Sequence, residues 1–308
     1  VWEGQITPCF YQKALHRVRP RFKDVDVYYS MYYVHITSKS PKMVKYVAQT
    51  SISHFTREQF LKFPIALPPL SEQKKIAEIL STWDAAIEQT RKLINTKKRL
   101  KKAFIQQLII EKWQTSSQED GKIFRAKEIF EVRSIRSHHN EPVLSVTQDK
   151  GVVPRNSLDR KIEASDTNLH SYKLVEPGDF IISLRSFQGG IEFSEFRGKV
   201  SPAYHVIRPK RKIDFGFFKH LFKSQDFIGR LAIAVIGIRD GKQVNYSDFS
   251  YLNLPFPPLE EQQVIGKFLT DLDCEIQLME KKQRTLEKQK RGLMQKLLTG
   301  EVRVKVND

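Results

Sequence analysis

An internal repeat is the feature of this sequence that most constrains its fold. Residues 67–73 match residues 256–262 at an offset of 189, and the match continues without a gap over 43 positions, of which 14 are identical. The same offset pairs Arg19-Pro20 with Arg208-Pro209 and Phe60 with Phe249. Such periodicity indicates one structural unit used twice. We expect each unit to end in a Pro-Pro-Leu-x-Glu-Gln segment and the stretch that follows it.

Each stretch after the Pro-Pro pair predicts a helix of about 40 residues, because no proline interrupts it and apolar residues recur at alternating spacings of four and three. Ser71 is the expected N-cap of the first helix, and Gly300 lies where the C-terminal cap of the second is expected. We expect the helices to pair as an antiparallel coiled coil, with Leu93 and Leu100 adding apolar contacts beside a weak middle. The alternative is that each helix packs only on its own domain. The predicted seam consists of Trp83, Ile87, Ile94, Phe104 and Leu108, and of Leu272, Ile276, Met279, Leu286, Leu293 and Leu297.

The residues between the helices predict an α+β domain. Short extended runs at 142–146, 173–175 and 180–183 alternate with turn signals such as residues 176–179, and residues 215–222 predict a short helix. Residues 1–63 resemble only the second half of this domain. The expected division is therefore residues 1–66 for the C-terminal part of a first domain, 67–112 for the first helix, 113–255 for the second domain, and 256–308 for the second helix and a tail.

The charge of the chain favours a polyanionic partner. The 308 residues carry a net charge of +17, which favours nucleic acid over ordinary solubilising charge. Cys9 and Cys274 are far apart and have no metal-ligand spacing, and His138-His139 has no nearby ligand framework. We therefore expect neither a disulfide nor a metal site, and a cytosolic chain. No apolar run approaches the length of a membrane span, so no membrane association is expected.

With these features the sequence resembles the specificity subunit of type I restriction-modification systems. The resemblance rests on the Pro-Pro-Leu-x-Glu-Gln segment that twice opens a long helix, and on phrases at residues 143–147, 151–154, 178–183 and 201–204. It implies two α/β target-recognition domains, each reading one half of a split double-stranded DNA target, with the paired helices setting the number of unread bases. It also implies two methylation subunits docked on this frame, with restriction subunits joining for cleavage. The expected location is the cytoplasm of a bacterium or archaeon.

The resemblance further implies that this chain binds no cofactor itself and that S-adenosylmethionine belongs to the methylation subunit. The sequence departs from the family pattern at its start. The second domain begins near Gly121, so its counterpart would begin about 70 residues before Val1. We expect that part of the first domain to be missing, and self-association through the helices is an open alternative.

Two polar loops are the expected DNA-reading elements, because specific readout needs side chains that reach base edges. In the first, Arg185 suits guanine and Gln188 suits adenine, and neighbouring glycines let the backbone approach closely. The second loop spans residues 237–245, and its repeat counterpart spans 48–56. A surface turn or a flexible connector is the alternative for each. The expected DNA-binding residues are Arg185, Ser186, Gln188, Arg239, Lys242, Gln243, Asn245, Thr147, Ser53 and His54, with Lys150, Arg155, Arg160, Lys199, Lys42 and Lys45 as phosphate candidates.

Two other classes of function stay open. A fused methyltransferase or nuclease is disfavoured, because both Pro-Pro pairs lack the preceding Asn or Asp of adenine methyltransferases and no Gly-Lys-Ser/Thr phosphate loop occurs. A coiled-coil scaffold that binds DNA without reading it would have no use for the two polar loops. The basic run at residues 97–102 fits phosphate, a partner subunit or a solvated helix face about equally well.

Overall fold

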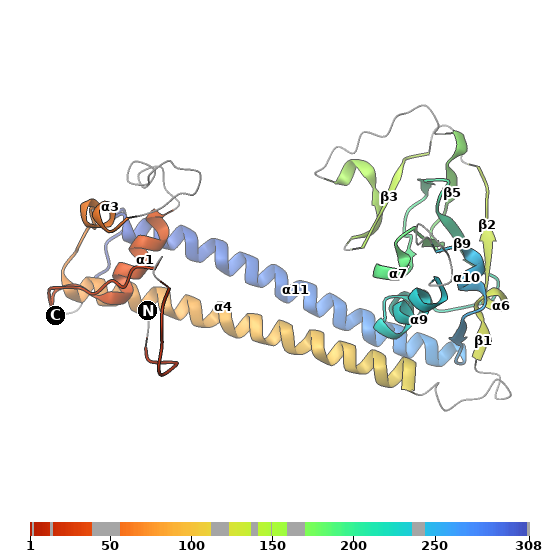
Figure 1. Ribbon diagram of the computed structural model, residues 1–308, viewed down its shortest axis with the longest axis horizontal. Coiled ribbons are helices and arrows are strands. Elements are labelled where there is room, and N and C mark those ends of the chain that lie inside the picture. The colour runs from red at the N-terminus through yellow and green to blue at the C-terminus, as the bar shows by residue number, and fades with distance from the viewer. Residues whose placement is uncertain are drawn as a thin grey trace. The chain divides into compact units, whose positions relative to one another are not determined.

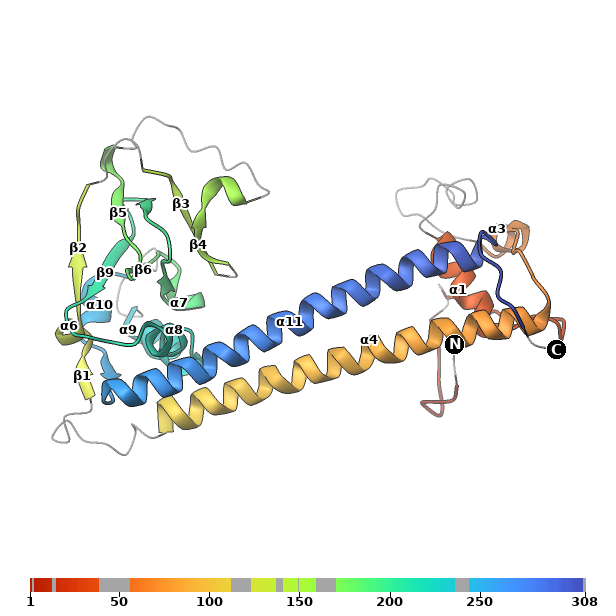
Figure 2. The same ribbon diagram turned by 180° about the vertical axis from the view of Figure 1, so that it is seen from behind.

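The computed structural model describes residues 1–306 except for residues 2, 13–14, 39–55, 112–122, 137–140, 149, 159–169 and 236–243. Two compact units divide the chain, one of residues 1–95 with 277–308 (unit 1) and one of residues 96–276 (unit 2). The helices α4 (Leu70–Ile105) and α11 (Leu259–Leu298) each run through both units (Figures 1 and 2). The division expected at residues 66, 112 and 255 stays a prediction.

The repeated Pro-Pro-Leu-x-Glu-Gln segment starts each long helix in the same way. The Gln73 N–H donates to Pro69 O at 3.0 Å, and the Gln262 N–H donates to Pro258 O at 3.0 Å. The side-chain amides of these glutamines donate to the carbonyls of Pro68 and Pro257, each at 2.8 Å. The helix therefore begins at Leu70, and the expectation that Ser71 is its N-cap is wrong, because Pro69 takes that place.

The two long helices end differently. α4 passes into a π-helical turn, Gln106–Glu111, which buries Ile109 and Ile110 in the core of unit 2. α11 ends at Leu298, and Gly300 follows with a φ of 79°. This left-handed backbone favours glycine and confirms the predicted C-terminal cap.

Within each unit α4 and α11 run antiparallel and are joined by the same ion pair. Lys101 of α4 donates to Asp273 of α11 at 2.6 Å in unit 2, and Lys290 of α11 pairs with Asp84 of α4 in unit 1. Lys101 and Lys290, like Asp84 and Asp273, are repeat equivalents. Each repeat therefore presents the same donor and the same acceptor to the other, as a twofold-related pair of helices requires. The antiparallel pairing is confirmed.

The burial of its residues agrees with the predicted heptad seam, which stays a prediction as a set of contacts between the helices. All eleven predicted seam residues are buried or half-buried, whereas Leu93 and Leu100, one position before Ile94 and Lys101, are each 47% exposed. The expectation that these two leucines add contacts beside the seam is wrong, because a one-residue step turns a helical side chain by about 100°. In unit 2, the ring of Phe104 instead meets the ring of Phe268 edge-on at 5.0 Å.

Unit 1 is helical in its described part. It contains α1 (Val27–Thr37), α3 (Arg57–Lys62) and segments of α4 and α11. Tyr29 and Tyr32 of α1 lie in a core cluster with residues of α4 and α11. At the opposite end of the chain, Arg303 donates to both carboxylate oxygens of the buried Glu72, at 2.8 and 2.6 Å. This contact ties the C-terminal tail to the first turn of α4.

Unit 2 contains the strands. A four-stranded antiparallel sheet has the order β2-β9-β6-β7, and three further pairs are β1-β10, β3-β4 and β5-β8. The strands are β1 (Ile123–Arg125), β2 (Phe130–Arg133), β3 (Leu144–Thr147), β4 (Gly151–Pro154), β5 (Lys173–Val175), β6 (Phe180–Ile182), β7 (Glu192–Phe193), β8 (Gly198–Val200), β9 (His205–Pro209) and β10 (Asn253–Pro255). The helices are α6 (Ala126–Ile129), α7 (Ser186–Gly189), α8 (Phe215–Phe222), α9 (Gln225–Val235) and α10 (Tyr246–Ser250), with a 3-10 turn at Arg155–Ser157. The α+β prediction is confirmed.

A cluster of phenylalanines forms the core of unit 2, where Phe130, Phe180, Phe218 and Phe222 are fully buried. The ring of Phe130 lies 5.3 to 5.7 Å from the rings of the other three. Rings at such distances contribute beyond the burial of their area. The core therefore fixes the sheet against α8, which contributes Phe218 and Phe222. Across the part of the chain that the structure describes, no helix is long and apolar enough to span a membrane.

Candidate nucleic-acid interface

The predicted loop after β6 forms a single helical turn, α7. The Gly190 N–H donates to Ser186 O at 2.8 Å, and the Ser183 N–H donates to Ser186 Oγ at 2.9 Å. Ser186 is only 1% exposed, so it stabilises the turn, and its assignment as a DNA contact is wrong. Arg185 and Gln188 are exposed at the two ends of this turn. The structure thus presents the two side chains expected to read bases and buries the serine between them.

The helical turn α7 is anchored to the end of α8. Lys223 Nζ donates to Gly189 O at 2.9 Å and forms an ion pair with the buried Glu192 of β7. Gly190 has a φ of 79°, and a Cβ at this position would lie 2.0 Å from Phe222 O. We expected these glycines to allow close approach to DNA. The structure shows instead that Gly190 allows close approach to α8.

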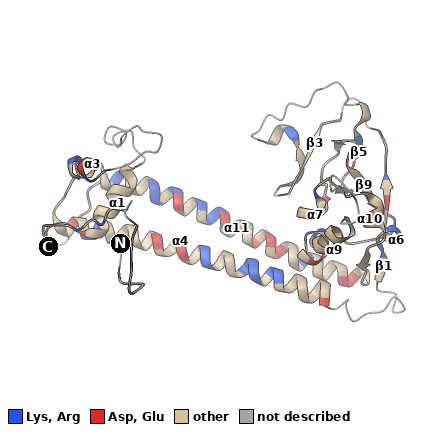
Figure 3. Ribbon diagram, in the orientation of Figure 1, with Lys and Arg blue, Asp and Glu red and all other residues tan. Residues whose placement is uncertain are grey.

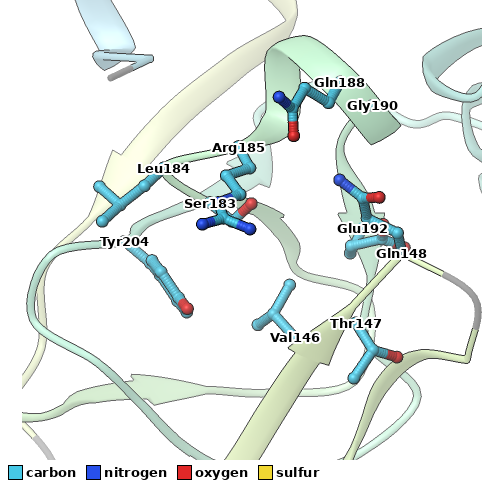
Figure 4. Close-up of a pocket in the computed structure, with 10 residues that line it drawn as sticks. All are labelled: Val146, Thr147, Gln148, Ser183, Leu184, Arg185, Gln188, Gly190, Glu192 and Tyr204. Carbon is cyan, nitrogen blue, oxygen red and sulfur yellow. The ribbon is translucent and has the colours of Figure 1, made fainter. Parts of the chain in front are cut away.

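A pocket of about 380 Å³ opens beside α7 (Figure 4). Figure 4 shows the guanidinium of Arg185, the ring of Tyr204 and the side chain of Val146 turned toward the same space. The ten lining residues come from β3 and the turn after it, the segment from the end of β6 through α7 to β7, and the position just before β9. They are Val146, Thr147, Gln148, Ser183, Leu184, Arg185, Gln188, Gly190, Glu192 and Tyr204.

Sequence reasoning selected Arg185, Gln188 and Thr147 but missed Tyr204 and Gln148 as pocket residues. Tyr204 lies 19 residues after Arg185 in the chain, and the pairing of Ile182 with His205 brings it beside the pocket. Only the strand register carries that information, and no local pattern in the sequence does. Thr147 lines the pocket, but its hydroxyl donates to Gly151 O at 3.1 Å and so holds the β3–β4 turn.

The remaining predicted contacts have different environments. Lys199 is 3% exposed on β8, so its assignment as a phosphate contact is wrong. Lys150 is exposed, Arg155 is half-buried, and the exposed Asn245 begins α10 with its N–H donating to Asp248 at 3.0 Å. Outside the described residues lie Lys42, Lys45, Ser53, His54, Arg160, Arg239, Lys242 and Gln243, together with His138 and His139.

The basic run of α4 contributes to the pairing of the two long helices. Lys97 pairs with Glu275 at 2.8 Å, and Lys101 pairs with Asp273 at 2.6 Å. Figure 3 shows the concentration of basic residues along this stretch of α4. Among the residues that the structure describes, no cluster of His, Cys, Asp and Glu could hold a metal ion.

The surroundings of two histidines of unit 2, His220 and His205, lower their pKa values. Burial and the nearby charges of Lys101 and Lys219 lower the pKa of His220 to about 4, although Asp273 opposes this shift. Burial also lowers the pKa of His205, with Lys173 contributing. Lys173 donates to the carbonyl of Tyr204 at 2.6 Å, which fixes the backbone at the edge of the pocket. Arg185 and Lys150 lie close to the pocket and are both exposed. Among the described residues, these two positive charges support a DNA contact.

Comparison with known proteins agrees with this architecture. The family model for the type I restriction modification DNA specificity domain matches residues 4–97 and 118–288. The putative type I restriction enzyme MjaX specificity subunit of Methanocaldococcus jannaschii is 28% identical over 330 residues, covering 99% of this chain and 75% of that protein. The MjaVIII specificity subunit of the same organism is 28% identical over 281 residues, covering 83% of this chain and 66% of that protein.

A solved structure shows the same fold. The S subunit of a type I restriction-modification system from M. genitalium superposes with a TM-score of 0.54 at 15% identity, covering 89% of this chain and 73% of that one. Because the family model covers most of the sequence, the chain belongs to the type I restriction-modification DNA specificity family.

Proposed function

We propose that unit 2 reads one half of a split DNA target for a type I restriction-modification complex, and that α7 is its main reading element. The observation that carries this proposal is the rigid turn that presents Arg185 and Gln188 while burying Ser186. Arginine pairs with the O6 and N7 atoms of guanine, and glutamine pairs with the N6 and N7 atoms of adenine, each through two hydrogen bonds. In this proposal Lys150, which is exposed on the turn between β3 and β4, contacts a phosphate.

In the same proposal, the domain to which unit 1 belongs reads the second half of the target. Support comes from the equivalence of the two units, because Asp26 caps α1 as Asp214 caps α8. The N–H groups of these aspartates donate to the motif glutamines Gln73 and Gln262, at 2.9 and 3.0 Å. Two similar domains on an antiparallel helix pair suit two DNA half-sites. In this proposal two methylation subunits and the restriction subunits dock on the chain and perform all catalysis, and S-adenosylmethionine binds to the methylation subunit.

A methylome experiment tests this function. The chain is expressed with the methylation subunit encoded beside its gene in a host without DNA methylases, and host DNA is sequenced for N6-methyladenine. We expect methylation at a split motif that disappears when this chain is omitted. A symmetric motif would instead indicate that two copies of the chain pair. Absence of methylation from a stable complex would contradict the proposal and favour a scaffold.

Arg185→Ala is expected to weaken binding to the motif by about 1–3 kcal/mol, the range for one bidentate base contact. Binding to random DNA should change little, because nonspecific affinity comes from phosphate contacts. Fluorescence anisotropy with motif and scrambled duplexes at fixed salt measures both affinities. Arg284→Ala, on an exposed position of α11, is the control for loss of one positive charge. An equal loss on both duplexes would make Arg185 a phosphate contact.

A further inference from the structure

We propose that the pocket beside α7 takes up one DNA base that has left the stack. This inference rests on the proposed function and specifies which part of the DNA the site receives. Bases that leave a duplex are held by aromatic or apolar side chains against their faces and by hydrogen bonds to their edges. The pocket lining combines both kinds of group, as its composition shows.

Apolar surface for a flat ring is provided by Val146, Leu184 and Tyr204. Hydrogen-bonding groups for the ring edge are provided by Arg185, Gln148 and the hydroxyl of Ser183. The volume of about 380 Å³ lies at the low end of the range for pockets that enclose small molecules. The pocket therefore suits a planar, neutral ligand with donors and acceptors around its edge.

The charges of the pocket argue against a phosphate or a metal ion. Glu192 lines the pocket, is 4% exposed and is paired with Lys223, so a buried carboxylate lies where a phosphate would be repelled. Arg185 is the one cation among the lining residues. A divalent cation needs several oxygen ligands, and Glu192 is the single carboxylate of the lining. A neutral, planar ligand is therefore the class that this pocket fits best.

The pocket is also built before any ligand arrives. Lys223 holds the end of α7 at Gly189 O, and Ser186 Oγ holds its start at the N–H of Ser183. On the opposite side, Lys173 holds the carbonyl of Tyr204. Removing a base from the stack is costly, and a preformed pocket avoids the further cost of ordering side chains. Figure 4 shows the guanidinium of Arg185 directed into the pocket, where its hydrogen-bond donors can meet the edge of a base that has left the stack.

A mismatch scan of the motif tests the proposal. The complex of this chain with its methylation subunit, without S-adenosylmethionine, is titrated with duplexes in which the base opposite each motif position is mismatched in turn. Because a mismatched base is already weakly paired, we expect binding at least fivefold tighter at one position that is not a methylated adenine. A base read in the groove would give weaker or unchanged binding at every mismatch. A scan in which no position other than the methylated adenines binds more tightly overturns the proposal.

Substitution of the stacking residue links this base to the pocket. Tyr204→Ala is expected to weaken binding to the matched motif about tenfold, as for loss of one stacked base, and to abolish the gain from the mismatch. Tyr204→Phe keeps the ring and should retain both, which separates stacking from the hydroxyl. Tyr251→Ala is the matched control, since Tyr251 is 65% exposed and is not a pocket residue. A mismatch gain that survives Tyr204→Ala would place the base elsewhere and overturn the proposal.

The scan itself uses the unaltered protein, so its outcome does not depend on whether Tyr204→Ala folds. Tyr204→Leu offers a second variant that removes the aromatic face and retains an apolar side chain. Failure of the unaltered complex to prefer the motif over random DNA would refute the proposed function. Motif preference without a mismatch gain would refute only the base pocket.

Discussion

Asp179→Ala is expected to lower the free energy of unfolding of unit 2 by about 3 kcal/mol, the low end of the range for removing one partner of a buried ion pair. Asp179 is fully buried and accepts a hydrogen bond from Arg208 Nε at 2.6 Å. Its other carboxylate oxygen accepts the Glu176 N–H at 2.8 Å and so closes the turn before β6. The low end applies because Arg208 is 32% exposed and keeps its contact with Glu176. Chemical denaturation, with hydrogen exchange of residues 173–183 to localise the effect, measures the change.

The control is Glu78→Ala, which breaks an exposed pair with Lys75 on α4 and should change the unfolding free energy by less than about 1 kcal/mol. Asp179→Asn should fall between the two, because the amide oxygen still accepts one hydrogen bond but carries no charge. Equal stability of Asp179→Ala and the control would show that the ion pair does not support β6. Since β6 leads directly into Ser183 and Arg185, we expect Asp179→Ala also to weaken motif preference.

The same network sets how unit 2 responds to acid. Hydrogen bonds from Arg133 and Arg208 lower the pKa of Glu176 from 4.5 to about 2. A carboxyl whose folded pKa is lowered stabilises the fold above its unfolded pKa, and this contribution is lost as the pH falls toward the folded value. The network therefore contributes in full above about pH 4.5 and fades between pH 4.5 and 2.

The long helices were the most predictable part of the fold, because their heptad pattern is local and repeats along the sequence. Burial at all predicted seam positions follows from this pattern, whereas the predicted start of the first helix lies two residues too late. Ser71 has the composition of an N-cap, but the glutamine two residues later binds the Pro68 carbonyl and draws the start of the helix back to Leu70. The Gln73 side chain, which donates to Pro68 O and accepts from the Asp26 N–H, favours this start over the one that the N-cap preference of Ser71 predicts.

The two repeats also correspond at positions that an alignment at the single offset of 189 does not match. Tyr32 donates to Asp84 at 2.6 Å in unit 1, and His220 lies 3.8 Å from Asp273 in unit 2. These residues follow the N-caps Asp26 and Asp214 at the same distance along the chain, but their offset is 188 rather than 189. A one-residue shift between α1 and α4 therefore hid the correspondence, which the shared helix contacts reveal.

The candidate site was only partly predictable. Arg185 and Gln188 are three residues apart and precede two glycines, so a local sequence pattern was enough to predict them as base-reading residues. Lys199 and Tyr204 could not be judged in that way, because the pairing of β8 with β5 buries Lys199 and the pairing of β9 with β6 brings Tyr204 to the pocket. Burial and assembly of a site from several strands depend on register, which no short segment specifies.

Gly190→Ala is expected to destabilise unit 2 by about 2–6 kcal/mol, the sum of two unfavourable effects. The backbone at φ 79° and ψ −171° is a region almost restricted to glycine, at a cost of about 1–3 kcal/mol for other residues. The new Cβ would also lie 2.0 Å from Phe222 O, and relieving such an overlap in a packed core costs about 1–3 kcal/mol. Because Phe222 O is backbone at the end of α8, α7 must move instead. We therefore expect motif preference to fall together with stability.

Gly229→Ala is the matched control, because Gly229 lies in α9 and a Cβ there would meet no atom within 4 Å. That substitution should stabilise the protein by about 0.4–1 kcal/mol, since alanine loses less conformational freedom on folding. Chemical denaturation measures the two variants with opposite expected signs, and competition between motif and scrambled duplexes measures reading. If Gly190→Ala lowered stability but left motif preference intact, α7 would not be the reading element. If both variants were as stable as the parent, the contact between Gly190 and Phe222 would not hold α7 in place.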